Sequence, residues 1–328
     1  VSGNLLTKQG TFNVTIDPEF EQPDLNDYPE LRAALANGGS VALSEDVTIS
    51  APLVVESGKT VEIDLNGHDI INTTSLPDTD PRYGNTTVFE VKGDATLNIK
   101  GDGDVKAIGT NLNEDGYRMA VYAYGDAQVN IYGGNFSNDQ DYNNHQAQLD
   151  LIYADQNAVI NIYGGTFESK SANDRGYWVL NLKDGSNAAI NVYGGTFVNF
   201  DPSNSMTENP VKNFVVATST TVKVSEDPQP NGSYEVVPEG GVVSVPIEVN
   251  DAESLIEALS NPVVANIEVA SSIDLSEKSA EELTFEEYKT IDIKEGVTIR
   301  LGQTNCLTAE KGLTLTGKGT IDNTSEDN

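Results

Sequence analysis

The stretch Asn161-Ile162-Tyr163-Gly164-Gly165-Thr166-Phe167 decides the fold of this chain, because a close copy of it stands on either side. The copy before it begins at Asn130 and the copy after it begins at Asn191, so the phrase returns after 31 and then 30 residues. A fixed period of this length is typical of stacked repeats, in which each unit buries its apolar face only against its neighbours. The phrase therefore predicts a solenoid.

Each repeat reads as a strand, a turn, a second strand and a Gly-Gly turn. Val129 and Ile131 share one parity in the second strand and are expected to point inward, whereas Asn130 and Tyr132 are expected to point outward. Equal register between copies predicts parallel stacking, and hence an all-β, right-handed parallel β-helix. The chain lacks the Leu-x-x-Leu-x-Leu pattern of a leucine-rich horseshoe. A propeller is disfavoured, since each blade needs four antiparallel strands in about 40 to 50 residues.

The copies differ most in the segments that complete each repeat. These segments vary in length and are rich in Asn, Asp, Ser and Tyr. Insertions in a solenoid collect on one flank, which is often the binding flank. We therefore expect function to reside in residues 72–87, 108–118, 135–149 and 166–178.

A helical pattern precedes the repeats at residues 25–36, where Asp27 is the expected N-cap and Leu31, Ala34 and Leu35 form an apolar stripe. A similar pattern returns at 249–259, and strand-like stretches follow both. The shared order predicts two related modules, each opened by a helix that covers the exposed end of its β-helix. The expected organisation is an N-terminal extension over residues 1–24, a first β-helix module over 25–200, a closing hairpin and connector over 201–246, and a second, shorter β-helix-like module over 247–328.

Charge limits the classes of partner. The 328 residues carry a formal net charge of −32, from 51 acidic and 19 basic side chains. Nucleic acids and anionic membranes are expected to be repelled, because phosphate binding depends on Lys and Arg. The single cysteine, Cys306, leaves no internal disulfide or cysteine-based zinc site, and no run of about 18 apolar residues predicts a membrane span. Because the sequence starts at Val1, we expect a processed or trimmed chain from which a signal or lipid anchor has been removed.

Several of these phrases together resemble pectate-lyase-like β-helix proteins of Bacteroides-type gut bacteria. Residues 25–74 carry the run Gly58-Lys59-Thr60-Val61-Glu62-Ile63-Asp64-Leu65-Asn66-Gly67, and Tyr-Gly-Gly-Thr-Phe stands at 163–167 and 193–197. Residues 194–202, 213–215 and 234–240 are similar to the closing part of such modules. The resemblance implies a secreted or surface-exposed protein of the kind described as adhesins. Related modules also occur in phage structural proteins.

No catalytic set stands out in the sequence. Polygalacturonase-like hydrolases combine an Asp-Asp pair with Gly-His-Gly for acid and base work. Here the only Gly-His is Gly67-His68, with no Asp-Asp pair nearby, and His145 lies in a polar insertion. No arrangement of Ser, His and Asp suggests an acyl-transfer nucleophile. We expect turn or surface roles for both histidines, and no catalytic residue.

Aromatic and arginine side chains in the variable segments are the predicted ligand contacts. Tyr132, Tyr163 and Tyr193 form a regular row that is expected to stack outside the helix; their recurrence in every copy favours a structural role over sugar binding. The arginines have a plainer use in ion pairs with the many carboxylates. The predicted contacts are Tyr83, Tyr117, Arg118, Tyr142, Arg175, Tyr177 and Trp178.

Two turns offer closely spaced carboxylates, the hard oxygen ligands that Ca²⁺ takes. They are Asp78 with Asp80, and Asp102 with Asp104. Neither turn fits an EF-hand loop or a nonapeptide calcium repeat, and a solvated turn is the plainer interpretation. No other cofactor is expected.

Three functions remain open at this point. The first is a non-catalytic surface or adhesion protein that recognises a glycan or a host or bacterial surface protein through the insertion flank. The second is a polysaccharide lyase or glycoside hydrolase with a site on the same flank. The third is a structural spacer or phage-like shaft, which a trimer in solution would favour.

Overall fold

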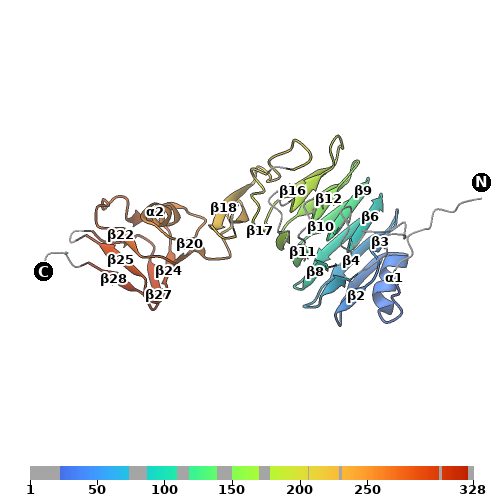
Figure 1. Ribbon diagram of the computed structural model, residues 1–328, viewed down its shortest axis with the longest axis horizontal. Coiled ribbons are helices and arrows are strands. Elements are labelled where there is room, and N and C mark those ends of the chain that lie inside the picture. Colours follow the sequence, from blue (N-terminus) through green and yellow to red (C-terminus); the bar gives the residue numbers. More distant parts are fainter. Residues whose placement is uncertain are drawn as a thin grey trace, which may run out of the picture.

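The computed structural model describes residues 23–73, 87–108, 118–138, 150–169, 178–205, 207–228, 231–302 and 305–323. Figure 1 shows two bodies along the longest axis, with a hairpin between them. Each body has its own hydrophobic cluster. Among the described residues, neither helix is long and apolar enough to cross a bilayer.

The first body is a parallel β-helix, which confirms the predicted fold (Figure 1). Right-handed coiling is the sense that connections between parallel strands favour. Three sheets, here named A, B and C, surround one core. Sheet A contains β1 (Gly39–Ala42), β4 (Thr60–Asp64), β7 (Thr96–Lys100), β10 (Gln128–Ile131), β13 (Val159–Ile162) and β16 (Ala189–Val192). Sheet C contains β3 (Leu53–Val55), β6 (Phe89–Gly93), β9 (Val121–Gly125), β12 (Ile152–Ala154) and β15 (Leu180–Leu182).

Sheet B continues into the hairpin that follows the helix. Its parallel strands are β2 (Val47–Ile49), β5 (Ile70–Asn72), β8 (Asp104–Ala107), β11 (Asn135–Asn138), β14 (Thr166–Ser169) and β17 (Gly195–Val198). The hairpin strand β19 (Ser233–Pro238) pairs antiparallel with β17, and β18 (Ser219–Ser225) pairs antiparallel with β19. The hairpin thereby covers the edge that the last coil would otherwise expose.

The repeated phrase stacks in the register that its period predicts. Ile160 is the register partner of Val129 on one side and of Ile190 on the other, and all three are buried. The outward asparagines bond from coil to coil: Asn161 Nδ2 donates to Asn130 Oδ1 at 2.9 Å, and Asn191 Nδ2 donates to Asn161 Oδ1 at 3.0 Å. The ladder satisfies amide groups that lie too deep for full hydration.

The Gly-Gly turn has a steric cause. A Cβ built on Gly164 would lie 2.7 Å from the backbone oxygen of Tyr132 in the coil below, a distance that real Cβ atoms do not show. Gly165 has φ +102°, which other residues rarely adopt. Successive coils can therefore approach at this corner only because the side chains are absent.

Helix α1 (Pro29–Asn37) covers the first coil with the predicted stripe, since Leu31, Ala34 and Leu35 are buried. The prediction that Asp27 caps this helix is wrong. The N-cap is Tyr28, because Pro29 takes the first helical position, where its fixed φ and missing N–H suit the helix start.

The second body is a shorter stack of three parallel sheets, named D, E and F. Strand β20 (Ile247–Val249) comes before helix α2 (Ala252–Ser260) and pairs with the next strand of sheet D, so the prediction that a helix opens this module is wrong. Asp251 is the N-cap of α2, and its Oδ1 accepts from Ser254 N at 2.8 Å. Sheet D contains β20 (Ile247–Val249), β21 (Asn266–Val269), β24 (Lys289–Ile293) and β27 (Leu313–Gly317). Sheet E contains β22 (Ile273–Leu275), β25 (Thr298–Leu301) and β28 (Thr320–Asp322). Sheet F contains β23 (Thr284–Phe285) and β26 (Thr308–Ala309).

A buried lysine ties α2 to this second stack. Lys289 Nζ donates to the carbonyl oxygens of Ala258, Asn261 and Val264 at 3.3, 2.7 and 2.6 Å. These oxygens stand at and just beyond the end of α2, where the helix dipole attracts a cation. Burial lowers the pKa of Lys289.

Candidate functional site

The variable segments all belong to one junction of the β-helix. In each coil concerned the chain leaves a strand of sheet B and returns through a strand of sheet C: β11 ends at Asn138, for example, and β12 begins at Ile152. The predicted insertion flank is therefore the junction between sheets B and C. Most of the predicted site residues lie outside the described residues, namely Tyr83, Tyr117, Tyr142, Arg175, Tyr177, Asp78 and Asp80.

Two predicted ligand contacts lie within the described residues. Arg118 is 1% exposed, so its guanidinium offers little surface to a ligand in this structure. Trp178 is half-buried, and its carbonyl oxygen accepts from Leu151 N at 3.1 Å. Their role as ligand contacts remains a prediction.

The outer face of sheet C, beside this junction, carries a group of tyrosines and carboxylates. Register pairs Glu90 of β6 with Tyr122 of β9, and Tyr122 with Tyr153 of β12. Tyr124 follows Tyr122 on the same side of β9, because side chains alternate along a strand. We call Glu90, Tyr122, Tyr124, Tyr153 and Glu208 the tyrosine–carboxylate face.

The tyrosine rings of this face are tilted against one another. The Tyr122 centroid lies 4.9 Å from that of Tyr124 and 5.6 Å from that of Tyr153, with interplanar angles of 31° and 37°. The Tyr124 hydroxyl donates to Glu90 Oε1 at 2.8 Å. Burial, followed by this bond, raises the pKa of Tyr124, so the phenol remains a neutral donor at neutral pH.

Glu208 reaches the face from the segment that follows the last coil. Its side chain is exposed; Oε2 accepts from the Tyr153 hydroxyl at 3.3 Å, and Oε1 accepts from Asp184 N at 3.3 Å. Its own backbone N–H donates to Asn181 Oδ1 at 3.0 Å. The segment is thus held against β15, and a carboxylate is placed at the rim of the tyrosine cluster.

Asp150 lies beneath this rim and is 3% exposed. Its Oδ1 accepts from Asn181 Nδ2 at 2.9 Å. Burial raises the pKa of Asp150 to about 7; the Asn181 bond opposes the shift, and the charge of Glu208 adds to it. Asp150 and Glu208 are therefore two neighbouring acids with different environments, one enclosed and one in water.

The row of Tyr132, Tyr163 and Tyr193 is built differently. Ring centroids lie 5.0 and 4.7 Å apart with interplanar angles of 8° and 14°, which confirms the predicted stacking. Both faces of Tyr163 are covered by its neighbours, so the row presents ring edges and hydroxyls to solvent. Face stacking on a sugar would be limited to the two ends, which supports a structural role.

The predicted calcium turn at Asp102 and Asp104 is partly occupied by protein groups. Asp104 forms an ion pair with Lys106, and its Oδ1 accepts from Asn135 Nδ2 at 3.0 Å. Asp102 is exposed. Within the described ranges, no group of three or more His, Cys, Asp or Glu side chains is placed to hold a metal ion.

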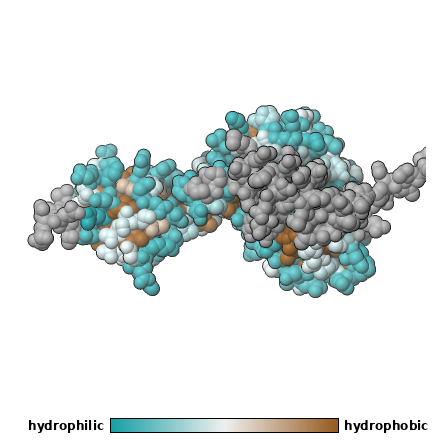
Figure 2. Space-filling view, in the orientation of Figure 1, coloured by the Kyte–Doolittle hydropathy of each residue, from teal (hydrophilic) through white to brown (hydrophobic). Residues whose placement is uncertain are grey.

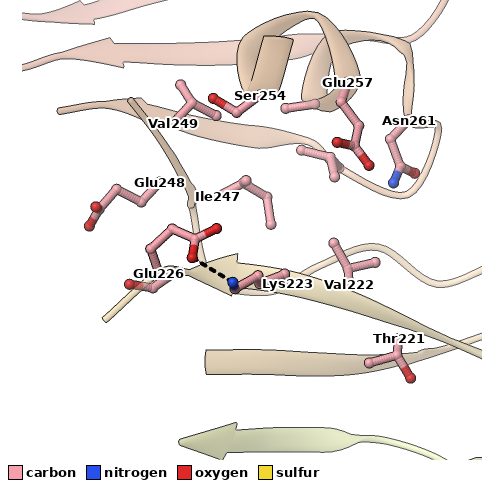
Figure 3. Close-up of a pocket in the computed structure, with 13 residues that line it drawn as sticks. Thr221, Val222, Lys223, Glu226, Ile247, Glu248, Val249, Ser254, Glu257 and Asn261 are labelled. Atoms are coloured by element: carbon pink, nitrogen blue, oxygen red, sulfur yellow. Dashed lines mark hydrogen bonds and ion pairs between the residues drawn. The ribbon is translucent and has the colours of Figure 1, made fainter. Parts of the chain in front are cut away.

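A pocket of about 200 Å³ lies between the hairpin and the second stack (Figure 3). Val222, Ile247 and Val249 give it apolar walls, and Glu226 Oε2 forms a 2.5 Å ion pair with Lys223 Nζ. Glu248 and Glu257 also line it. On the side drawn in Figure 2 the coloured surface is mostly hydrophilic, in keeping with the acidic composition.

Sequence reasoning missed the tyrosine–carboxylate face. A signal was present, since Tyr122 and Tyr153 stand 31 residues apart and each precedes a copy of the repeated phrase. Glu208 had no such signal, because it belongs to a segment outside the repeats. Comparison of the chain with protein-family models, curated proteins and solved structures finds no match.

Proposed function

We propose that this protein is a non-catalytic, secreted or cell-surface binding protein whose tyrosine–carboxylate face contacts a glycan. The observation that carries the proposal is the grouping of Tyr122, Tyr124 and Tyr153 with two carboxylates at the junction where the coils differ in length. Variation between repeats is a feature of solenoid binding flanks.

A neutral glycan fits the chemistry of this face. Aromatic rings pack against the apolar faces of sugars, and carboxylates accept hydrogen bonds from hydroxyl groups. An acidic glycan would meet the exposed carboxylate of Glu208 and a net charge of −32. The proposed ligand is therefore an uncharged oligosaccharide.

The test is a glycan-array screen of the intact chain, followed by affinity measurements on variants. Tyr122→Ala and Glu208→Gln are expected to weaken binding to a neutral glycan at least tenfold. Tyr163→Ala, in the middle of the stacked row, is the matched control and should bind as the wild type does. Circular dichroism would show that each variant is folded. Binding that is unaffected by both face substitutions, or confined to protein ligands, would overturn the proposal.

A glycoside hydrolase is the second candidate, because Asp150 and Glu208 show the pattern of an acid–base pair. A buried acid with a raised pKa, such as Asp150, beside a carboxylate in water is the usual arrangement of a proton donor and a base. Release of reducing ends from neutral polysaccharides, abolished by Asp150→Asn, would favour this candidate over simple binding. Absence of release from a broad panel would favour the binding protein.

A further inference from the structure

The pocket between the hairpin and the second stack is separate from the tyrosine–carboxylate face and has no part in the function proposed above. Strand β18 forms one wall, and β20 and α2 form the other (Figure 3). Val222 and Val224 of β18 belong to the hydrophobic cluster of the second stack. One continuous core therefore holds both walls in place. Junctions of this kind between two parts of a protein are preferred positions for ligand sites.

The middle of the pocket is apolar. Ile247 points from β20 into the space between α2 and β18 (Figure 3). Further buried side chains complete the apolar lining, namely Val222, Val249, Ala258 and Val264. The volume of about 200 Å³ is smaller than that of pockets for drug-sized ligands, so a short hydrocarbon chain is the size of ligand that fits. Each methylene group buried against such a lining strengthens binding by up to about fourfold.

Carboxylates stand on both sides of this apolar middle. In Figure 3, Glu226 and Glu248 lie on one side of Ile247, and Glu257 lies on the other, where it points from α2 toward β18. Lys223 Nζ pairs with Glu226 at 2.5 Å, whereas Glu248 and Glu257 form no ion pair within the described part of the chain. With one lysine against three glutamates, the lining carries a formal charge of −2. Such a pocket attracts cations and repels anions.

The end of α2 does not supply a second cation site. The carbonyl oxygens of Ala258 and Asn261 already accept from Lys289, whose buried side chain is not part of the pocket lining. A cation in the pocket would therefore be bound by the side chains of Glu248 and Glu257. These two carboxylates do not form a metal site, since the described residues place no group of three acidic, histidine or cysteine side chains to hold an ion.

We propose that this pocket binds a short aliphatic diamine. One ammonium group pairs with Glu257, the other pairs with Glu248, and the hydrocarbon chain between them lies against Ile247. The two positive charges balance the charge of −2 on the lining. Each ammonium group also donates hydrogen bonds to a carboxylate, which accepts only. A monoamine would satisfy one side of the pocket, and a diol of the same length would lack the charges.

Isothermal titration calorimetry of the full chain with ethylenediamine, putrescine and cadaverine, at physiological ionic strength, tests the proposal. The affinity is expected to rise in that order, by up to about fourfold for each added methylene group. Butylamine, which has the same four-carbon chain as putrescine but one amine, should bind at least tenfold more weakly. Amines that merely gather on the acidic surface would show no gain with chain length, because that surface offers them charge without apolar contact.

Two substitutions on α2 locate the site. Glu257→Gln is expected to weaken cadaverine binding at least tenfold, whereas Glu253→Gln removes the same charge from an exposed position outside the pocket and should leave the affinity unchanged. Circular dichroism would show that both variants are folded. In the wild type, nuclear Overhauser effects should connect the methylene groups of cadaverine with the methyl groups of Ile247. Equal weakening in the two variants, an affinity independent of chain length, or no saturable binding would rule the pocket out as a diamine site.

Discussion

The side-chain amide of Asn181 donates a 2.9 Å hydrogen bond to the buried carboxyl group of Asp150. The carbonyl oxygen of the same amide accepts from the backbone of Glu208. One asparagine thus joins an enclosed acid to the segment that supplies the exposed carboxylate of the face. The protonation state of Asp150 should consequently influence the stability of the protein and the position of Glu208 against β15.

The raised pKa of Asp150 predicts a specific pH dependence of stability. Between the ordinary value of 3.8 and about 7, the folded state holds a proton that the unfolded state has lost. The free energy of unfolding should therefore fall as pH rises through this window, by about 1.4 kcal/mol per unit at most, and level off above it. Denaturant unfolding at pH 5 and pH 8 measures the difference.

Asp150→Asn provides the control for this dependence, because the many other carboxylates also repel one another more as pH rises. The variant keeps an acceptor for Asn181 and removes the titration. The free energy of unfolding of the variant minus that of wild type should be larger at pH 8 than at pH 5. An equal offset at the two pH values would contradict the shift assigned to Asp150.

Replacing Lys289 should destabilise the second stack. Lys289→Met keeps most of the side-chain volume but leaves the carbonyl oxygens of Ala258, Asn261 and Val264 without their donor. The expected cost is about 2 to 4 kcal/mol, because buried unpaired carbonyl groups are expensive. Calorimetry should show a lower transition temperature, whereas Lys318→Met, at a side chain 78% exposed, should have little effect. Equal shifts in the two variants would refute this role of Lys289.

Asn161, the central member of the asparagine ladder, should contribute more to stability than Asn157, which lies in a separate, exposed row. Asn161 is 8% exposed and bonds to asparagines both below and above it, so Asn161→Ala should cost about 1 to 3 kcal/mol. Asn157 occupies a similar place between Asp126 and Asn187 but is exposed, so water replaces its partners. Asn157→Ala should therefore cost less than half as much. Chemical denaturation compares the two, and a larger loss at Asn157 would argue against burial as the cause.

Much of the architecture follows from local rules that the sequence displays. Strand alternation placed Val129 and Ile131 inside, and the 31-residue period placed Tyr132 beside Tyr163. These predictions succeed because neighbouring coils repeat one local geometry. The expected cap at Asp27 failed, because Pro29 fixes where the first helix begins.

The tyrosine–carboxylate face follows from these rules only in part. The 31-residue period also places Tyr122 beside Tyr153, whereas Glu208 returns to β15 from outside the repeats. Nor does the sequence reveal that Asp150 is enclosed, since its burial depends on packing between segments distant in the chain. Such long-range packing is set by the whole fold and is not a property of any single repeat.

The most direct measurement of the central claim is tyrosine-selective NMR of the intact chain, titrated with a neutral glycan identified on the array. The sequence contains 13 tyrosines, which Tyr→Phe substitutions would assign. The account predicts that the ring signals of Tyr122, Tyr124 and Tyr153 shift with saturation while those of Tyr132 and Tyr163 stay in place. Shifts confined to the stacked row, or no shift in any ring with bound glycan, would contradict it.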